Sequence, residues 1–153
     1  MDKKDRQILE ILQEDAKTAQ AEIARRVGLS PASVNERIHK LEQQGIIKKY
    51  VAILDDRKAG KDITAFIEVF IEHPRHEEQF VKLTRELEEV QEVHYVTGDF
   101  SCLLKVKVPD RVALRELVLD RINSLDGIRQ TKTVIVLQTA KEETKLALKA
   151  QAE

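Results

Sequence analysis

Apolar residues recur at helical spacing along the N-terminal third of the chain. In the stretch SPASVNERIHKLEQQG, Val34, Ile38 and Leu41 fall at positions i, i+4 and i+7, which places them on one side of a helix. Ser30 is a favoured N-cap, and Pro31 suits the first helical position because the amide hydrogen that it lacks has no helical partner there. The pattern predicts an amphipathic helix, which by itself is typical of any surface helix in a folded protein.

Two further helices are predicted upstream of this one. The segment AEIARRVGLS has Ile23 and Val27 on its apolar side and ends at Gly28, which permits the positive φ that a tight turn requires. The segment MDKKDRQILEILQEDA places Ile8 and Leu12 where they can cover the other two helices. A short helix, a glycine turn and a capped helix form a helix-turn-helix, whose second helix enters the DNA major groove.

The hydrophobic pattern changes after residue 62. The segments ITAFIEVFIE, VQEVHYV, SCLLKVKV and KTVIVLQ predict strands, whereas HEEQFVKLTRELEEV and DRVALRELVLDRINSL keep helical spacing. In SCLLKVKV, Lys105 and Lys107 alternate with apolar residues, which predicts a hairpin with one solvated face. The order β-α-β-β-α-β is the ferredoxin-like arrangement, whose helices cover one sheet face. The other face is left for a partner, so we expect self-association.

The sequence therefore predicts an α+β protein with two domains. We expect a helix-turn-helix domain over residues 1–53, a linker over 54–62, a ferredoxin-like domain over 63–140 and a tail over 141–153. The linker LDDRKAGKD is dense in charge, and Gly60 interrupts regular structure. Before it, IIKKYVAIL has the pattern of a short strand that would tie the two domains together. The tail is rich in alanine and charge, a composition compatible with a helix, but we expect a solvated tail without chemistry of its own.

Several segments together resemble a known family. The run from DKKDRQILEILQEDA to GIIKKY is similar to the DNA-binding half of the Lrp/AsnC (feast/famine) transcriptional regulators of bacteria and archaea. VTGDFSCLLKV resembles the loop of that family's effector domain, and TKTVIVLQ resembles its last strand. The similarities follow the family's order over nearly all of the chain. They imply a DNA-binding regulator with an amino-acid effector, built from dimers that often assemble into octamers.

Composition limits the possibilities independently of this resemblance. With 153 residues, of which 42% are hydrophobic, the chain can form one ordinary domain or two small ones. Its one cysteine, Cys102, excludes an intramolecular disulfide. The charged segment MDKKDRQ does not have the apolar character of a signal peptide, and no apolar run approaches the ~18 residues that span a membrane. We therefore expect a cytoplasmic protein without a membrane partner.

The net charge of −1 at first argues against a nucleic-acid partner, because such proteins neutralise phosphates with Lys and Arg. The distribution of charge answers this objection. Residues 1–60 hold 12 basic and 10 acidic side chains, whereas residues 61–153 hold 14 and 17. This modest basic excess suits a duplex surface if several helix-turn-helix domains bind together and add avidity.

The residues predicted to contact double-stranded DNA gather on the second helix of the helix-turn-helix. The full set is Arg26, Ser30, Pro31, Ala32, Ser33, Asn35, Glu36, Arg37 and Lys40. Ser33, Asn35 and Glu36 are expected to face bases, because the beginning of a recognition helix lies nearest the groove floor. The three cations of the set are expected to hold phosphates. Glu36 would accept a hydrogen bond from a cytosine amino group and set specificity.

The loop TGDFS has two interpretations that the residues leave open. In the first it is an ordinary turn, in which Gly98 supplies positive φ and Asp99 caps its own backbone. The resemblance favours the second, in which the loop binds an amino acid at a contact between dimers and Asp99 attracts the ammonium group. The residues carried over from the family as effector-binding are Thr97, Gly98, Asp99, Phe100, Ser101, Gln130, Thr131 and Thr133.

The hypothesis that the protein is an enzyme finds little support in the sequence. It has no G-x-G-x-x-G, P-loop or H-E-x-x-H motif and no cysteine cluster. His73 and His76 are the best metal candidates, but they lie beside Pro74 in a predicted strand-to-helix loop, and a metal site normally needs three or four convergent ligands. We therefore expect no enzyme, no metal and no cofactor besides the amino-acid effector. The alternative is a metabolite-binding or enzymatic ferredoxin-like protein whose N-terminal helices are only an interaction module, which salt-dependent duplex binding by residues 1–60 would distinguish.

Overall fold

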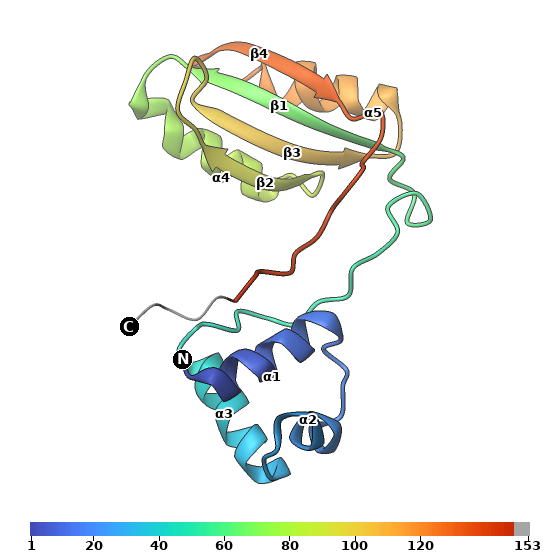
Figure 1. Cartoon of the computed structure of the whole chain (residues 1–153). Helices are drawn as coiled ribbons and strands as arrows, with labels where there is room; N and C mark the ends of the chain where they lie inside the picture. Colours follow the sequence, from blue (N-terminus) through green and yellow to red (C-terminus); the bar gives the residue numbers. More distant parts are fainter. Residues whose placement is uncertain (149–153) are drawn as a thin grey trace. The chain divides into compact units, whose positions relative to one another are not determined.

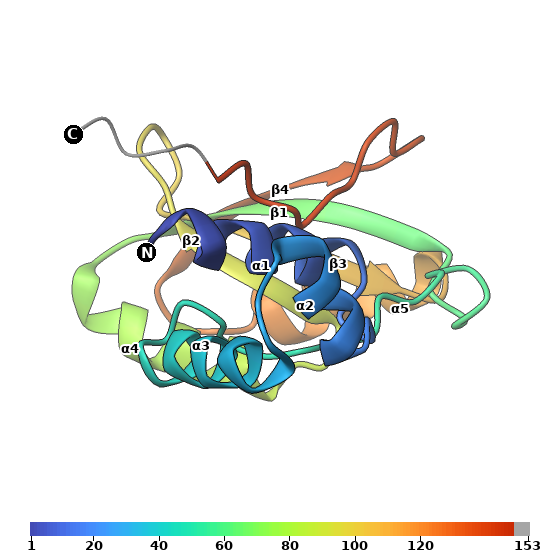
Figure 2. The ribbon, with the colours of Figure 1, turned by 60° about the horizontal axis from the view of Figure 1, so that its bottom comes forward.

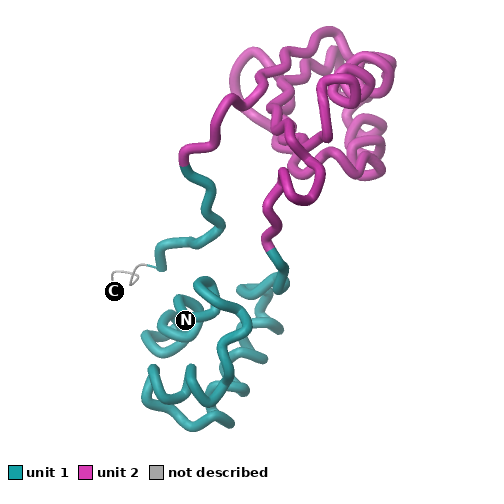
Figure 3. Tube along the Cα trace, turned by 90° about the vertical axis from the view of Figure 1, so that its right-hand side faces the viewer, with its two compact units in different colours: residues 1–52, 141–153 teal, residues 53–140 magenta. Residues whose placement is uncertain are grey.

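The computed structural model describes residues 1–148, which form two compact units. The first unit contains residues 1–52 with the described part of the tail, 141–148, and the second contains residues 53–140 (Figure 3). Each unit has its own cluster of buried apolar residues, so each is stabilised by a separate core. The first unit is called the head below, and the second is called the sheet domain.

Three helices build the head: α1 at Lys3–Glu14, α2 at Gln20–Val27 and α3 at Pro31–Gln43 (Figure 1). Each contributes an apolar stripe to one shared core, as the sequence predicts. The core residues are Ile8, Ile23, Ala24, Val27, Val34 and Ile38.

The turn between α2 and α3 follows the predicted chemistry. Gly28 has φ of +66° and ends α2, a conformation that costs other residues steric strain. Ser30 then caps α3, because its hydroxyl accepts a hydrogen bond from the Ser33 amide at 3.1 Å. Pro31 occupies the first turn of α3, where no helical bond is lost. The helix-turn-helix is therefore confirmed.

Four antiparallel strands form the sheet domain. They are β1 at Ile63–Ile71, β2 at Val90–Tyr95, β3 at Cys102–Val108 and β4 at Ile128–Ile135, in the order β2-β3-β1-β4. The first strand thus lies in the centre between the third and the fourth, as in a ferredoxin-like domain. The α+β fold class is confirmed.

Helical segments cover one face of this sheet. They are η1 at Pro74–His76, α4 at Glu77–Glu86, α5 at Arg111–Arg115 and η2 at Glu116–Ile122, which has π-helical bonding. Both views place α4 and the α5–η2 segment on the same side of the strands (Figures 1 and 2). Their buried side chains meet the inward residues of β1 and β3 in a single core: Phe80, Leu114, Leu117, Ile122, Ile67, Val69, Leu104 and Val106.

One element expected from the sequence is absent. Residues 46–54 form no strand, although their pattern resembles one. A strand needs a neighbour that pairs with its backbone, and the amides of Ile46 and Ile47 instead donate to the carbonyl of Leu41 at the end of α3. Residues 141–148 form no helix, and the remainder of the tail lies outside the described residues. The tail contacts α1 through Gln13, which exchanges two hydrogen bonds with the backbone of Leu146 at 2.7 and 3.1 Å.

The prediction that β3 has one solvated face is only partly correct. Lys107 is just 8% exposed, and its ammonium group forms an ion pair with Asp56. The turn over residues 56–60 places this carboxylate beside the sheet, which a strand pattern alone does not reveal. Lys105 is also partly covered and approaches Glu92 of β2 at 3.8 Å.

Candidate DNA-binding and effector sites

The recognition helix α3 is held by its apolar stripe and exposes its polar side. Val34, Ile38 and Leu41 are buried, which fixes the rotation of the helix about its axis. The predicted base-facing residues Asn35 and Glu36 are exposed as a result, while Ser33 and Arg37 are half-buried. Pro31, Ala32 and Lys40 are also exposed.

Arg37 is tied to the beginning of α1. Its guanidinium lies 2.7 Å from the carboxylates of both Asp2 and Asp5. These two residues also form a capping box, in which each side chain accepts a hydrogen bond from the backbone of the other. The bond from the Asp5 amide and the neighbouring Arg37 together lower the pKa of Asp2 to about 2. Arg37 therefore joins α3 to α1, and two acidic groups already neutralise its charge.

The cations of the head differ in how they are paired. Arg25 and Arg26 share the carboxylate of Glu22, each at 2.7 Å, and these bonds lower the pKa of Glu22 to about 2. Lys40 makes no side-chain ion pair or hydrogen bond within residues 1–148. Among the predicted phosphate contacts, Lys40 thus has the charge most available to a partner.

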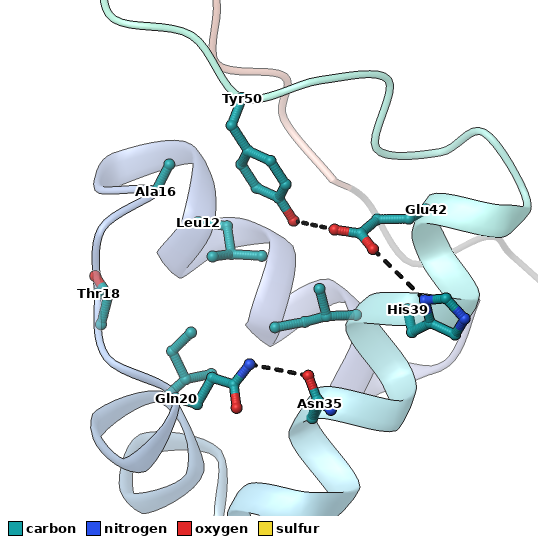
Figure 4. Close-up of a pocket in the computed structure, with 10 residues that line it drawn as sticks. Leu12, Ala16, Thr18, Gln20, Asn35, His39, Glu42 and Tyr50 are labelled. Carbon is teal, nitrogen blue, oxygen red and sulfur yellow. Dashed lines mark hydrogen bonds and ion pairs between the residues drawn. The ribbon is translucent and has the colours of Figure 1, made fainter.

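A pocket of about 320 Å³ opens between the helices of the head (Figure 4). Its lining residues come from α1, the start of α2, α3 and the segment after α3: Leu12, Ala16, Thr18, Gln20, Ile23, Asn35, Ile38, His39, Glu42 and Tyr50. The Tyr50 hydroxyl donates to Glu42 at 2.9 Å, and burial together with this carboxylate raises the pKa of Tyr50 to about 12. The Gln20 side chain donates to Asn35 at 2.9 Å.

Gln20, Glu42 and Tyr50 are absent from the set that the sequence predicts. Gln20 and its partner Asn35 are 15 residues apart along the chain, and Tyr50 and Glu42 are 8 apart, so only the packing of the head brings each pair together. The sequence gives only a weak signal for these residues, because polar residues are common at the first position of a short helix.

The loop between β2 and β3 contains the first part of the predicted effector site. Gly98 has φ of +118°, so the predicted positive φ is confirmed. Thr97, Gly98 and Asp99 are exposed, whereas Phe100 and Ser101 are half-buried. Asp99 forms no cap with its own loop in the described part of the chain, unlike the simple turn interpretation. Its carboxylate is therefore available to other groups.

The base of this loop is tied to the central strand β1. The Ser101 hydroxyl accepts a hydrogen bond from the Ile71 amide at 3.1 Å, and the Ser101 amide donates to the Val69 carbonyl at 3.0 Å. On the other side of β1, Thr131 pairs with the same Val69. The structure thus brings Ser101 and Thr131 to one end of the sheet.

The β4 candidates do not share one face. Thr131 and Thr133 lie opposite Val69 and Ile67, whose side chains are buried under the helices. Gln130 precedes Thr131, so its side chain points to the other face of the sheet. The Thr131 hydroxyl donates to Asn123 at the end of η2, at 3.0 Å.

Other chemistry suggested by single residues has no support in the described part of the chain. No group of three or more His, Cys, Asp and Glu residues there could hold a metal ion. His73 accepts a hydrogen bond from the Arg75 amide at 3.2 Å, which is a helix-cap role. Cys102 is fully buried, and burial raises the pKa of its thiol to about 11. Among residues 1–148 no helix has the length and apolar character needed to cross a membrane.

Comparison with known proteins agrees with both halves of the structure. Residues 64–146 match the Lrp/AsnC ligand-binding domain, and residues 1–48 match a winged helix-turn-helix DNA-binding domain. The leucine-responsive regulatory protein of Escherichia coli K12 is 38% identical over 153 residues, covering 99% of this chain and 93% of that protein. The corresponding protein of Klebsiella pneumoniae shows the same identity and coverage.

Solved structures give the same result. A transcriptional regulator from Neisseria meningitidis in complex with L-Met has a TM-score of 0.92 and 32% identity, covering 96% of each chain. The AsnC protein of E. coli has a TM-score of 0.89 and 33% identity, covering 95% of this chain and 97% of that one. These relatives are transcriptional regulators, which confirms the prediction that the chain is not an enzyme. The chain belongs to the Lrp/AsnC family of DNA-binding transcriptional regulators, with a helix-turn-helix head and an Lrp/AsnC ligand-binding domain.

Proposed function

We propose that this protein controls transcription in the cytoplasm by binding duplex DNA through α3 and by changing its DNA affinity when an amino acid binds the sheet domain. The observation that carries the proposal is the capped recognition helix, which buries one stripe and exposes Asn35, Glu36 and Lys40 on the other side. The L-Met complex of the similar Neisseria regulator supports an amino acid as the effector. The proposed domain limits are 1–53, 54–62, 63–140 and 141–153.

The proposed DNA contacts fall into two groups. Ser33, Asn35 and Glu36 read bases, with Ser30, Pro31 and Ala32 beside them at the start of the helix. Lys40 is the foremost phosphate contact because its charge is unpaired in the head. Arg26 contributes less because it shares Glu22 with its neighbour. Arg37 chiefly positions α3 against α1, since Asp2 and Asp5 hold it.

The proposed effector site uses the exposed loop Thr97–Ser101. Its amides would take the amino acid's carboxylate, and Asp99 would hold the ammonium group. Ser101 and Thr131 lie at the same end of the sheet, which supports a site there with Phe100, Gln130 and Thr133 nearby. Because this loop is open in a single chain, we propose that a neighbouring dimer completes the site where two dimers meet and that dimers assemble into octamers.

The DNA roles are tested by two substitutions. Lys40→Ala should weaken binding to all duplex sequences alike and reduce the steepness of the salt dependence, because one phosphate contact is lost in each head. Glu36→Ala should instead change which sequences are preferred. Both are measured by selection from a randomised duplex library followed by salt titration. Uniform scaling of affinity by both variants would show that these roles are wrongly assigned.

The effector is tested by a thermal-shift screen of the twenty amino acids. A ligand that binds only the folded protein raises its melting temperature, by mass action. Asp99→Asn retains the shape of the side chain but removes its charge, so the apparent affinity for the amino acid found should fall about tenfold to a hundredfold, while DNA binding without ligand is unchanged. Equal responses of both proteins would return Asp99 to the role of a turn residue.

A further inference from the structure

Gln20 and Asn35 face each other across the two helices of the helix-turn-helix. The side-chain amide of Gln20, the first residue of α2, donates to the carbonyl oxygen of Asn35 on α3 at 2.9 Å. Figure 4 shows the two side chains directed toward one another from these helices. Both residues are exposed, and neither side chain has another hydrogen bond within residues 1–148. The pair is thus accessible from solvent and held only by its own bond.

The buried core sets the spacing of this pair. Ile23, one turn after Gln20, and Val34, immediately before Asn35, are both fully buried in the head core. The two helices therefore have a fixed register beneath the amides. Because this frame already fixes the backbone, a hydrogen bond between the two side chains must offset only their lost rotamer freedom.

The bond determines which group of the Asn35 amide faces away from Gln20. A side-chain amide has one acceptor oxygen and one amino group with two donor hydrogens. The oxygen of Asn35 faces Gln20 to accept its bond, so the amino group at the other end of the planar amide is turned away from Gln20 and toward a partner. An unrestrained asparagine matches adenine, because it can donate to N7 and accept from N6 at once. Guanine presents two acceptors, N7 and O6, and thymine presents O4.

We propose that Gln20 is a positioning residue that makes Asn35 read bases as a hydrogen-bond donor, so that guanine or thymine is preferred over adenine where α3 places Asn35. The inference rests on the proposed function, because it requires that α3 enter the major groove. It adds a residue of α2 to the specificity determinants, although Gln20 itself need not touch a base.

The test uses the full-length protein and changes the polarity of the pair. Gln20→Glu is nearly isosteric, but its carboxylate only accepts hydrogen bonds. The amide of Asn35 must then turn its amino group toward residue 20 and present its oxygen outward. This oxygen favours adenine or cytosine, whose amino groups donate. Gln44→Glu is the matched control. Gln44 is exposed near the end of α3, so this substitution adds the same charge without touching the Gln20–Asn35 pair.

A randomised duplex library first gives the sequence preferred by the wild type. The base pair read by Asn35 is the one at which Asn35→Ala loses its preference. Four duplexes that differ only there are then titrated with each variant, and the ratios of affinity are compared. The wild type should favour guanine or thymine by about fivefold or more. Gln20→Glu should invert this preference, Gln20→Ala should weaken it, and Gln44→Glu should keep it while lowering all affinities alike.

The possible results separate this inference from the function on which it rests. A wild type that selects adenine at that position would overturn the inference and leave DNA binding intact. So would a Gln20→Glu variant with wild-type base ratios and an unchanged melting temperature, or an Asn35→Ala variant that selects the wild-type sequence. A wild type that binds all duplexes equally, or none, would overturn the proposed function and this inference with it.

Discussion

Replacing Gly127 with alanine should destabilise the sheet domain more than any comparable glycine substitution in it. Gly127 immediately precedes β4 and has φ of +83°, and its carbonyl accepts a hydrogen bond from the Glu72 amide at 2.8 Å. A Cβ at this position would lie 2.2 Å from Cγ, 2.4 Å from Cδ2 and 2.7 Å from Cβ of His76. The side chain therefore meets both a strained backbone and an occupied space.

Gly60 supplies the matched control. Its φ of +78° is nearly the same, it lies in the same unit, and a Cβ there would meet no heavy atom within 4 Å. Gly60→Ala thus isolates the left-handed backbone cost of roughly 1 to 2 kcal/mol. Gly127→Ala adds overpacking against His76, typically about 1 to 3 kcal/mol. We expect a total loss of about 2 to 5 kcal/mol for Gly127→Ala.

The assay is urea unfolding followed by circular dichroism, with all variants at one protein concentration because assembly also affects stability. His76→Ala in the Gly127→Ala background removes the two shortest contacts and leaves the one at 2.7 Å, so it should restore part of the loss. Equal destabilisation by Gly127→Ala and Gly60→Ala would refute the reasoning, because it would show that the His76 side chain moves aside without cost.

Three further predictions concern the head and the thiol. The Asp2 pKa of about 2 lies below its ordinary 3.8, so the bonds of Asp2 to Asp5 and Arg37 stabilise the head above about pH 4, and this contribution is lost as the pH falls through about 2. Asp2→Asn should therefore flatten the acid unfolding curve in that window, and an unchanged curve would contradict the pairing. Ser30→Ala should cost about 1 kcal/mol of head stability in thermal unfolding and Ser30→Gly only a few tenths, whereas equal losses would exclude a capping role. Because burial raises the pKa of Cys102 to about 11, a thiol reagent at pH 8 should label the native protein slowly and the denatured protein fast, and rapid native labelling would show that the thiol is accessible.

Local chemistry explains which parts of the fold can be predicted from sequence. Ser30, Pro31 and Gly28 define the ends of α2 and α3 because caps and turns depend on residues next to each other. The strands and helices of the sheet domain follow from hydrophobic period in the same way. By contrast, residues 46–54 have a strand-like pattern but no strand to pair with, and Lys107 lies in a strand pattern that suggests exposure.

Long-range packing decides the features that the sequence does not reveal. Asp2 and Arg37 are 35 residues apart, yet their contact assigns Arg37 a structural role beside its predicted DNA role. Gln20 and Asn35 meet only because Ile23 and Val34 fix the two helices. The effector residues are carried over from the family, and the structure adds that Thr131 pairs with Val69 of the central strand, a neighbour that no residue type indicates.

The dependence of DNA affinity on the amino acid tests the central proposal most directly. The full-length protein is titrated onto its selected duplex by fluorescence anisotropy, with and without a saturating concentration of the amino acid that raises the melting temperature most. An amino-acid-responsive regulator should show a change in DNA affinity of about fivefold to 150-fold, the usual range of coupling between two sites. An amino acid that stabilises the protein but leaves the DNA affinity unchanged would contradict regulation through the sheet domain.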